Sequence, residues 1–378
     1  MKTPSIPPAL ARSGLLLGLL LHTTMAVAGD GVVGTATLEL ENTATGRKVA
    51  SELWFKTAPD ARIEWLSPRL PLRSIPIARN AEPQPSPRKH PLIVVSHGNW
   101  GSRFSQGWLA LDLVKAGYVV LSTSHPGTIG DDQTAAGRYR LWDRSRDVSF
   151  AVDEVLKNRK WAALIDEDRI GFVGHSFGGW TGVSLAGGRY DHARQRTFCR
   201  NADRKDFYCD GTLKDDIAGI PAADAADSFR DGRIKAFYIM GSGPGQGFAT
   251  DSLKSIRAPF VVDTAQFDES LEPLSNSTHL ARQIPSAREV VRPVGHFAYV
   301  PECRWLVGPI LTRLAGLPLC DDPKGVDRRL VHKQVARDVI AFFNGTLAQA
   351  VSAEEVQEEP GAPPDPALPS IASPSRRA

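Results

Sequence analysis

Residues 174–179 read Gly-His-Ser-Phe-Gly-Gly, and they directly follow the apolar run 169–173. In a G-x-S-x-G turn from a strand into a helix, the glycines remove side chains that would collide, so the serine hydroxyl projects from the end of the sheet. The next run, 180–186, is compatible with a helix. This context predicts that Ser176 is a nucleophile, whereas a near match at 182–186 is interpreted as packing inside the helix.

A serine needs a base, and the base needs a carboxylate that orients it. In chains with this type of turn, the acid and then the histidine follow the serine in sequence. His296 follows the apolar run 289–294 in Gly-His-Phe, which places it on a loop at the carboxyl end of a predicted strand. We therefore expect His296 to be the base, in preference to the other histidines after the serine, which are His192, His279 and His332.

Three carboxylates near one another are candidates for the orienting acid. Asp268 lies just beyond the predicted strand 259–264, in a loop at the end of the sheet that holds the serine. Asp263 lies inside that strand, where a structural hydrogen bond is the more natural role, and Glu269 adjoins Asp268. Loops carry carboxylates for many reasons, so Asp268 is favoured while Asp263 and Glu269 stay open.

Residues 95–101, Val-Ser-His-Gly-Asn-Trp-Gly, follow the first strongly apolar run after the N-terminal segment. A loop in this place presents a second backbone N–H to the negative charge that develops when a serine attacks a carbonyl. Gly98 permits the close turn, so the amides of Asn99 and Phe177 are the predicted oxyanion-hole donors. The side chains of His97 and His175 are expected to brace the two loops by hydrogen bonds.

The elements that must position these residues alternate along the chain. Residues 35–40 and 49–55 alternate apolar and polar side chains, which predicts a leading antiparallel hairpin. Short apolar runs that suit buried parallel strands follow at 92–96, 118–122, 169–173, 234–240, 259–264 and 289–294. Helices fit between them, the clearest having one apolar stripe of Val148, Ala151, Val152, Val155 and Leu156. This order predicts a parallel α/β sheet whose ligands gather at the carboxyl ends of the strands.

The ends of the chain differ in composition from its centre. Residues 1–28 hold basic residues, an apolar run at 15–21 and then Ala-Val-Ala, which predicts a cleavable signal peptide and a secreted or periplasmic protein. The run is shorter than the roughly 20 apolar residues that a membrane-spanning helix needs. Residues 352–378 are rich in Pro, Ala, Glu and Ser, which predicts a disordered tail. Residues 29–351 are expected to form one domain, with 82–91 as a Pro-rich surface linker.

Four cysteines fit an exported protein, and proximity favours Cys199 with Cys209 and Cys303 with Cys320. Neither Cys-x-x-Cys nor clustered Cys/His spacing occurs, so no metal site is expected. The net charge is +3, and basic residues are interspersed with acidic ones, which gives no argument for a nucleic-acid partner. A Gly-rich loop at 241–247 comes late and contains a proline, so it is predicted to lie at the rim of the site and no cofactor is expected.

Several motifs occur in order along the chain and are more specific together than singly. They are His97-Gly98, Gly-Tyr-Val-Val at 117–120, Ser-His-Pro-Gly at 124–127, Asp-Arg-Ile-Gly at 168–171, the serine turn at 174–179, and Gly-His-Phe at 295–297. On these motifs the chain resembles the α/β-hydrolase superfamily, from about residue 35 to 343. It is most similar to the exported bacterial branch described as dienelactone-hydrolase-like and related to platelet-activating-factor acetylhydrolase.

The resemblance implies an α/β-hydrolase fold with a mostly parallel, doubly wound sheet and, at 188–233, a cap-like insert. It also implies a metal-free serine esterase that acts through an acyl-enzyme, with Ser176, His296 and Asp268 as the triad. Dienelactone hydrolases have a cysteine at the turn, so the serine argues against lactone ring opening. In the acetylhydrolases the acid follows the preceding strand, where residues 241–247 here hold no carboxylate, which argues against a phospholipid substrate.

The sequence thus predicts a carboxylic-ester hydrolase with a small-molecule or lipid-like ester as substrate. Trp100, Trp180 and Phe297 are the predicted substrate-binding residues. A hydrolase of phospholipid or polyester acyl chains with the same mechanism is the nearest alternative, and thioester or peptide cleavage could use the same residues. An alternative of another class is a non-catalytic exported binding protein that kept the fold.

Overall fold

A computed structural model describes residues 32–67, 71–201, 207–209, 223–304, 308, 310, 314 and 318–348. The predicted signal peptide, 1–28, and the predicted tail, 352–378, lie outside the described residues. Part of the predicted insert 188–233 also lies outside them. Among the helices that the structure describes, none combines the length and the apolar character needed to span a bilayer.

Ten strands form one sheet, in the order β12-β11-β10-β9-β5-β6-β2-β1-β4-β3. From β12 to β6 all neighbours are parallel, while β2 runs antiparallel to both β6 and β1. The strands are β1 (Val33–Asn42), β2 (Arg47–Lys56), β3 (Glu64–Leu66), β4 (Ile75–Arg79), β5 (His90–Ser96), β6 (Val119–Thr123), β9 (Ile165–His175), β10 (Ile234–Met240), β11 (Phe260–Ala265) and β12 (Ala287–Arg292). A separate short pair is β7 (Thr128–Ile129) with β8 (Asp132–Gln133). The predicted parallel sheet and leading hairpin are confirmed.

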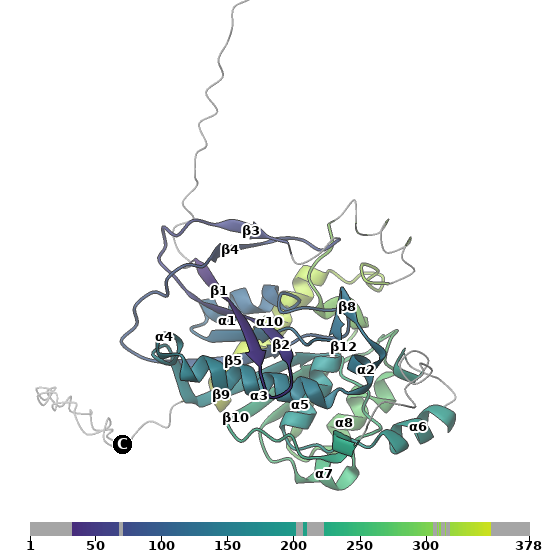
Figure 1. Cartoon of the computed structure of the whole chain (residues 1–378). Helices are drawn as coiled ribbons and strands as arrows, with labels where there is room; N and C mark the ends of the chain where they lie inside the picture. Colours follow the sequence, from purple (N-terminus) through teal and green to yellow (C-terminus); the bar gives the residue numbers. More distant parts are fainter. Residues whose placement is uncertain are drawn as a thin grey trace, which may run out of the picture.

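Helices cover both faces of the sheet (Figure 1). Side chains of α3 and α5 pack on one face, and side chains of α1 and α10 pack on the other. The helices are α1 (Gly107–Lys115), α2 (Ala135–Tyr139), α3 (Trp142–Lys157), α4 (Arg159–Ala162), α5 (Phe177–Leu185), α6 (His192–Asn201), α7 (Thr250–Ser255), α8 (Ser277–Gln283) and α10 (Arg328–Thr346). Three short 3₁₀ turns are η2 (Ala223–Ala226), η3 (Pro273–Ser275) and η4 (His296–Tyr299).

Strand β5 shows why the central strands read as continuous apolar runs. Leu92 and Val94 point into the core under α3 and α5, whereas Ile93 and Val95 point into the core under α1 and α10. Successive side chains of a strand alternate between faces, and both faces of this sheet are covered by helices. The central positions of the strand, 92–95, must therefore be apolar, as in parallel sheets generally.

Helix α3 carries the predicted stripe but is buried more widely than predicted. Val148, Ala151, Val152 and Val155 are buried, and Leu156 is partly buried. Polar residues of the same helix, among them Arg144, Ser145 and Asp147, are buried as well. Polar groups of this kind need partners when they leave water, and those partners lie beneath the candidate site described below.

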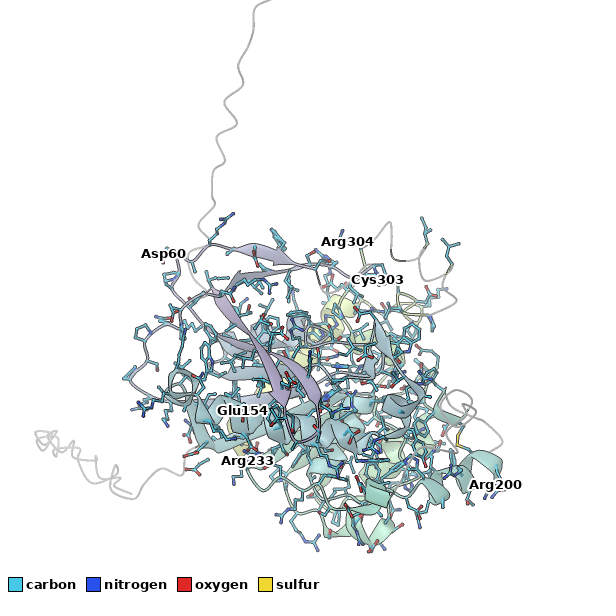
Figure 2. The ribbon with its side chains drawn as sticks, viewed as in Figure 1. Asp60, Glu154, Arg200, Arg233, Cys303 and Arg304 are labelled. Carbon is cyan, nitrogen blue, oxygen red and sulfur yellow. A yellow bond between two sulfur atoms is a disulfide. The ribbon has the colours of Figure 1, made fainter. Side chains whose placement is uncertain are left out.

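Both cysteine pairs favoured by proximity in the sequence are disulfides, Cys199 with Cys209 and Cys303 with Cys320. The segment that contains Cys303 pairs with the N-terminal part of the chain through a bridge from Leu72. Figure 2 shows Cys303 and its neighbour Arg304 at the same side of the molecule as β3 and β4. In the same view Arg200, near the end of α6, lies at the opposite periphery.

Candidate active site

Ser176 lies between the end of β9 and the start of α5 in a backbone conformation that L-residues rarely adopt, with φ 57° and ψ −118°. Its backbone N–H donates to the carbonyl of Met240 on the neighbouring strand β10. A strained conformation of this kind persists where the surrounding structure enforces it and marks functional positions. Ser176 is 7% exposed, so its hydroxyl lies at the boundary of the core.

Two glycines permit the strained turn because no side chain would fit at their positions. A Cβ atom on Gly174 would lie 2.1 Å from the carbonyl oxygen of Gly178. A Cβ atom on Gly178 would lie 2.0 Å from the carbonyl oxygen of Ser96, at the end of β5. The sequence Gly-x-Ser-x-Gly is therefore a packing requirement that brings the serine turn against the loop after β5.

Ser176, His296 and Asp268 form a hydrogen-bonded chain of three side chains. The Oγ atom of Ser176 lies 3.1 Å from Nε2 of His296, and Nδ1 of His296 lies 2.7 Å from Oδ2 of Asp268. The Oδ2 atom of Asp268 acts as the acceptor in this contact, so Nδ1 of His296 carries the proton and Nε2 is free to accept the serine proton. The structure thus brings the predicted serine, histidine and carboxylate together, from the ends of β9, β11 and β12.

The surroundings of His296 tune its basicity. Burial lowers the pKa of its imidazole, but the negative charge of Asp268 and the hydrogen bond to that carboxylate outweigh burial, so the pKa is raised above the ordinary value. The carboxyl group of Glu269 adds to this effect. A histidine whose pKa is raised in this way is a stronger base, and its imidazolium form is more stable once it has taken the serine proton.

The two other candidate carboxylates have different partners. Glu269 accepts the backbone N–H of His296 at 3.0 Å, so it holds the loop that carries the ring. Asp263, inside β11, accepts two hydrogen bonds from Nε of Arg292 at 2.8 and 3.0 Å. The hydroxyls of Tyr238 and Tyr299 also donate to Asp263. Asp263, within β11, therefore makes structural hydrogen bonds, which is the role predicted for it.

The loop after β5 lies directly against the serine. A Cβ atom on Gly98 would lie 2.9 Å from Cβ of Ser176. Among the described residues, neither the backbone N–H of Asn99 nor that of Phe177 donates to a protein acceptor. These are the two amides predicted for an oxyanion hole, one in the loop after β5 and one on the residue that follows the serine.

His97 and His175 make hydrogen bonds within and between the loops. Nε2 of His97 accepts the backbone N–H of His125 at 3.2 Å, so its Nδ1 carries the proton and donates to the Gly98 carbonyl at 2.6 Å. Nε2 of His175 donates to the carbonyl of His296 at 3.1 Å. Burial lowers the pKa of both histidines well below the ordinary value. Both rings are therefore uncharged at neutral pH, and they hold the loops in place through these hydrogen bonds.

The three predicted substrate-binding aromatics lie in different environments. Trp100 is 52% exposed and has a positive φ of 66°, and Phe297 is partly exposed and packs edge-on against the His296 ring. Trp180 is 1% exposed and packs between Tyr190 and Phe248 in the core. A substrate could reach Trp180 only if those rings moved, because they cover it in the described structure.

Two contacts near the serine were not predicted from the sequence. Tyr208, from the cysteine-bearing insert, packs edge-on against Phe177, with ring centroids 6.0 Å apart. The backbone N–H of the adjacent Phe207 donates to the carbonyl of Ser270, in the loop that carries Asp268. The disulfide Cys199–Cys209 joins this segment of the insert to α6, so the insert reaches the site through residues 207–209. In the sequence, only the fact that Phe207 and Tyr208 are aromatic residues could have indicated that this part of the insert packs near the serine.

The Gly-rich loop 241–247 lies at the site. A Cβ atom on Gly241 would lie 3.5 Å from both Nδ1 of His296 and Oδ2 of Asp268. Gly245 donates its backbone N–H to the side chain of Asn276 at 2.8 Å. Over the described residues, no group of three or more His, Cys, Asp or Glu side chains is arranged to hold a metal ion.

Comparisons with known proteins agree with this architecture. A family model described as the alpha/beta hydrolase family matches residues 93–362, which is most of the chain. The chain therefore belongs to the alpha/beta hydrolase family, and the predicted α/β-hydrolase fold is confirmed.

Among solved structures, a ferulic acid esterase from Streptomyces cinnamoneus is similar, with a TM-score of 0.54 and 19% sequence identity. The match covers 89% of this chain and 95% of the esterase. At this identity the likeness concerns the fold. No curated protein sequence matched the chain significantly.

Proposed function

We propose that this protein is a serine hydrolase that cleaves carboxylic esters through an acyl-enzyme. The observation that carries the proposal is the continuous chain from Ser176 through His296 to Asp268, with hydrogen-bond distances of 3.1 and 2.7 Å. A nucleophile, a base and an orienting acid in this order are the parts that nucleophilic catalysis needs. Membership of the alpha/beta hydrolase family and the fold shared with an esterase support the same activity.

In the proposed mechanism, Ser176 Oγ attacks the ester carbonyl carbon while Nε2 of His296 takes the hydroxyl proton. The tetrahedral oxyanion accepts hydrogen bonds from the amides of Asn99 and Phe177. His296 then gives the proton to the leaving alcohol, which departs and leaves an acyl-serine. Water, deprotonated by His296, attacks the acyl-serine, and collapse of the second tetrahedral intermediate releases the acid and restores the serine.

The substrate proposed is a small-molecule or lipid-like ester, with Trp100 and Phe297 at the entrance. Both side chains are partly or largely exposed beside the serine turn or the base. A hydrolase of phospholipid or polyester acyl chains is the alternative with the same mechanism, and placement in the dienelactone-hydrolase-like or acetylhydrolase-related branch belongs with this proposal. A non-catalytic binding protein is the alternative of another class, which the intact chain of three side chains disfavours.

We also propose that the protein is exported, to the periplasm or beyond. Support comes from the N-terminal pattern in the sequence and from the two disulfides. Disulfides form and persist in oxidising compartments and are rare in the cytosol.

The test is hydrolysis of p-nitrophenyl esters of increasing acyl length by the mature, disulfide-intact protein, together with labelling by a fluorophosphonate probe. The comparison is with Ser176→Ala and with Ser184→Ala, the serine of the near match inside α5. We expect turnover and labelling in the wild type and in Ser184→Ala, and neither in Ser176→Ala. The acyl-length series separates short-chain esters from long acyl chains.

Turnover and labelling that survive in Ser176→Ala would overturn the assignment of the nucleophile. A folded wild type with neither turnover nor labelling, its fold checked by circular dichroism, would overturn the proposed hydrolase and favour the binding protein.

A further inference from the structure

We propose that Arg144 is a positioning residue that joins the two halves of the oxyanion hole and places a buried positive charge beneath them. This inference rests on the proposed function, because it concerns the same site. Arg144 lies near the start of α3, outside every sequence motif discussed above, and is 1% exposed. A guanidinium group is rarely found in a protein core, and this one donates four hydrogen bonds to described residues.

Two of these bonds reach the loop that carries the first oxyanion-hole amide. Nη2 of Arg144 donates to the carbonyl oxygen of His97 and, at 3.3 Å, to Oγ of Ser96. His97 precedes Gly98 and Asn99, the residues that lie against the nucleophile and present the amide. A third bond, from Nη1 to Oγ1 of Thr128 at 2.6 Å, reinforces this side, because the carbonyl of Thr128 accepts the backbone N–H of Trp100.

The remaining bond reaches the helix that carries the second amide. Nε of Arg144 donates to Oγ1 of Thr181 at 3.1 Å, and that hydroxyl donates to the carbonyl of Phe177 at 2.9 Å. Phe177 supplies the other predicted amide and directly follows Ser176. One rigid, planar guanidinium therefore connects the loop after β5 with the first turn of α5. Arginine suits this task because its donors have a fixed geometry.

The charge of Arg144 lacks a direct counter-ion. Its four acceptors are a carbonyl and three hydroxyls, and among the described residues no carboxylate forms an ion pair with it. Burial lowers the pKa of Arg144 to about 9, partly offset by the more distant negative charge of Asp147. The group is thus still cationic at neutral pH. A buried cation of this kind favours the neighbouring site when negative charge develops there.

A directed series of hydrogen bonds keeps the guanidinium in place. Ser96 accepts from Arg144 and donates to Nε2 of His125 at 2.9 Å, while Nδ1 of His125 donates to Asp147 at 3.1 Å. Burial lowers the pKa of His125 well below the ordinary value, so the ring is neutral and each nitrogen has one role. Arg47 holds Asp147 with two bonds of 2.8 Å, which completes the series at the edge of the core.

This arrangement would act on the transition state more than on the substrate. The amides of Asn99 and Phe177 must lie at the correct separation to bind one oxygen together. Their two hydrogen bonds become strong only when the carbonyl oxygen of the substrate becomes an oxyanion. Interactions that are stronger in the transition state raise kcat, whereas uniform binding changes KM. Loss of the connection should therefore lower kcat and leave KM nearly unchanged.

The test compares Arg144→Met, Thr181→Val and the double variant with the wild type. A control is Ser145→Ala, which removes a buried hydrogen bond between the same two helices, from Ser145 to Ser184 at 3.0 Å, and touches neither half of the oxyanion hole. We expect kcat to fall about 100-fold in Arg144→Met and about tenfold in Thr181→Val. KM should stay within about threefold in both, and Ser145→Ala should keep the wild-type kcat.

Two further readouts separate positioning from general destabilisation. Affinity for an alkyl boronic acid, which forms a tetrahedral anion on the serine, should fall in parallel with kcat in Arg144→Met. The double variant should lose little more than Arg144→Met alone, because both changes break one connection. All variants are assayed below their unfolding temperature, measured by circular dichroism, and Thr181→Val keeps the test open if Arg144→Met does not fold.

A folded Arg144→Met or Thr181→Val with wild-type kcat and boronate affinity would overturn the inference. The inference would also be overturned if the loss of activity in these variants came from a higher KM or from a smaller folded fraction, with kcat unchanged. Failure of the proposed function looks different, because there the wild type itself has no turnover and no boronate affinity.

Discussion

Asp268 and Glu269 are neighbours in the chain that bind different parts of the same histidine. Oδ2 of Asp268 lies 2.7 Å from Nδ1 of the His296 ring, whereas Oε2 of Glu269 accepts the backbone N–H of His296 at 3.0 Å. The other oxygen of Asp268 accepts the backbone N–H groups of Ser270 and Leu271, which fixes the carboxylate itself. Ring and loop are thus held separately, and the two carboxylates should differ in their effect on catalysis.

Replacement of these carboxylates by amides tests that difference. In Asp268→Asn the amide cannot hold the ring in the tautomer with a proton on Nδ1, so we expect kcat to fall about 10⁴-fold. In Glu269→Gln the amide oxygen can still accept the backbone N–H, so we expect a loss of about tenfold or less. Steady-state kinetics on a p-nitrophenyl ester measure both, and equal losses in the two variants would contradict the separate roles.

The pH dependence of kcat/KM should report the raised pKa of His296. Protonated His296 cannot accept the serine proton, so activity falls as the pH decreases through its pKa. Because Asp268 and Glu269 raise that pKa above the ordinary 6.5, the acidic midpoint should lie above pH 6.5. The measurement is kcat/KM from pH 5 to 9 with the buffer rate subtracted, and a midpoint below 6.5 would argue against this electrostatic effect.

Gly98→Ala should inactivate the protein without unfolding it. The new methyl group would lie 2.9 Å from Cβ of Ser176, so the loop with the Asn99 amide must move away from the nucleophile. We expect kcat to fall at least about 100-fold, as for loss of an oxyanion-hole donor. Gly232→Ala is the matched control, since a Cβ atom there meets nothing within 4 Å. Near-normal activity in Gly98→Ala would show that the loop does not need this close approach.

Acidification should destabilise the fold because several histidines are buried in the neutral form. Burial lowers the pKa of His97, His125 and His175 well below 6.5 in the folded state. Their stabilisation is fully present above pH 6.5 and is lost as the pH falls below it, because the unfolded chain then takes up protons that the folded chain excludes. His296, with its raised pKa, has the opposite sign but is a single group.

We therefore expect the free energy of unfolding in urea to decrease below pH 6.5 by about 1.4 kcal/mol per pH unit for each such histidine. His125→Gln should reduce this slope by about 1.4 kcal/mol per pH unit, the contribution of one histidine. A free energy of unfolding that stays constant from pH 7 to 5 would mean that these rings are protonated in the folded state.

The central strands were predictable because their burial imposes a simple pattern. Both faces of β5, β6 and β10 are covered, so each strand contains a run of buried apolar or aromatic side chains, at 92–95, 119–121 and 236–240. The last strand was predicted at 289–294 but extends from Ala287 to Arg292, because it lies at the edge of the sheet, where several side chains are exposed and the pattern is weak. The shortest strands, β3, β7 and β8, are too brief to show any period.

The candidate site was predictable where backbone geometry restricts the residue type. The turn at Ser176 needs glycines at fixed positions, and His296 lies in the loop shortly after β12, so the motif and the order of the elements indicated both. The network under the site was not predictable. Charged residues in a helical pattern such as that of α3 are normally assigned to solvent. Only the fold shows that Arg144 and Asp147 turn inward, toward partners far away in the sequence.

The strand order also determines when the proposed site can exist during synthesis. The loop after β5 and the serine turn after β9 come from the first half of the chain, whereas Asp268 and His296 follow β11 and β12. Among the strands that the structure describes, β12 lies at the edge of the sheet and pairs with β11. A nascent chain, or a proteolytic fragment that ends before β12, would therefore carry the nucleophile without its base. Hydrolysis would then begin only when the last strand of the sheet has joined it, so activity would report completed folding.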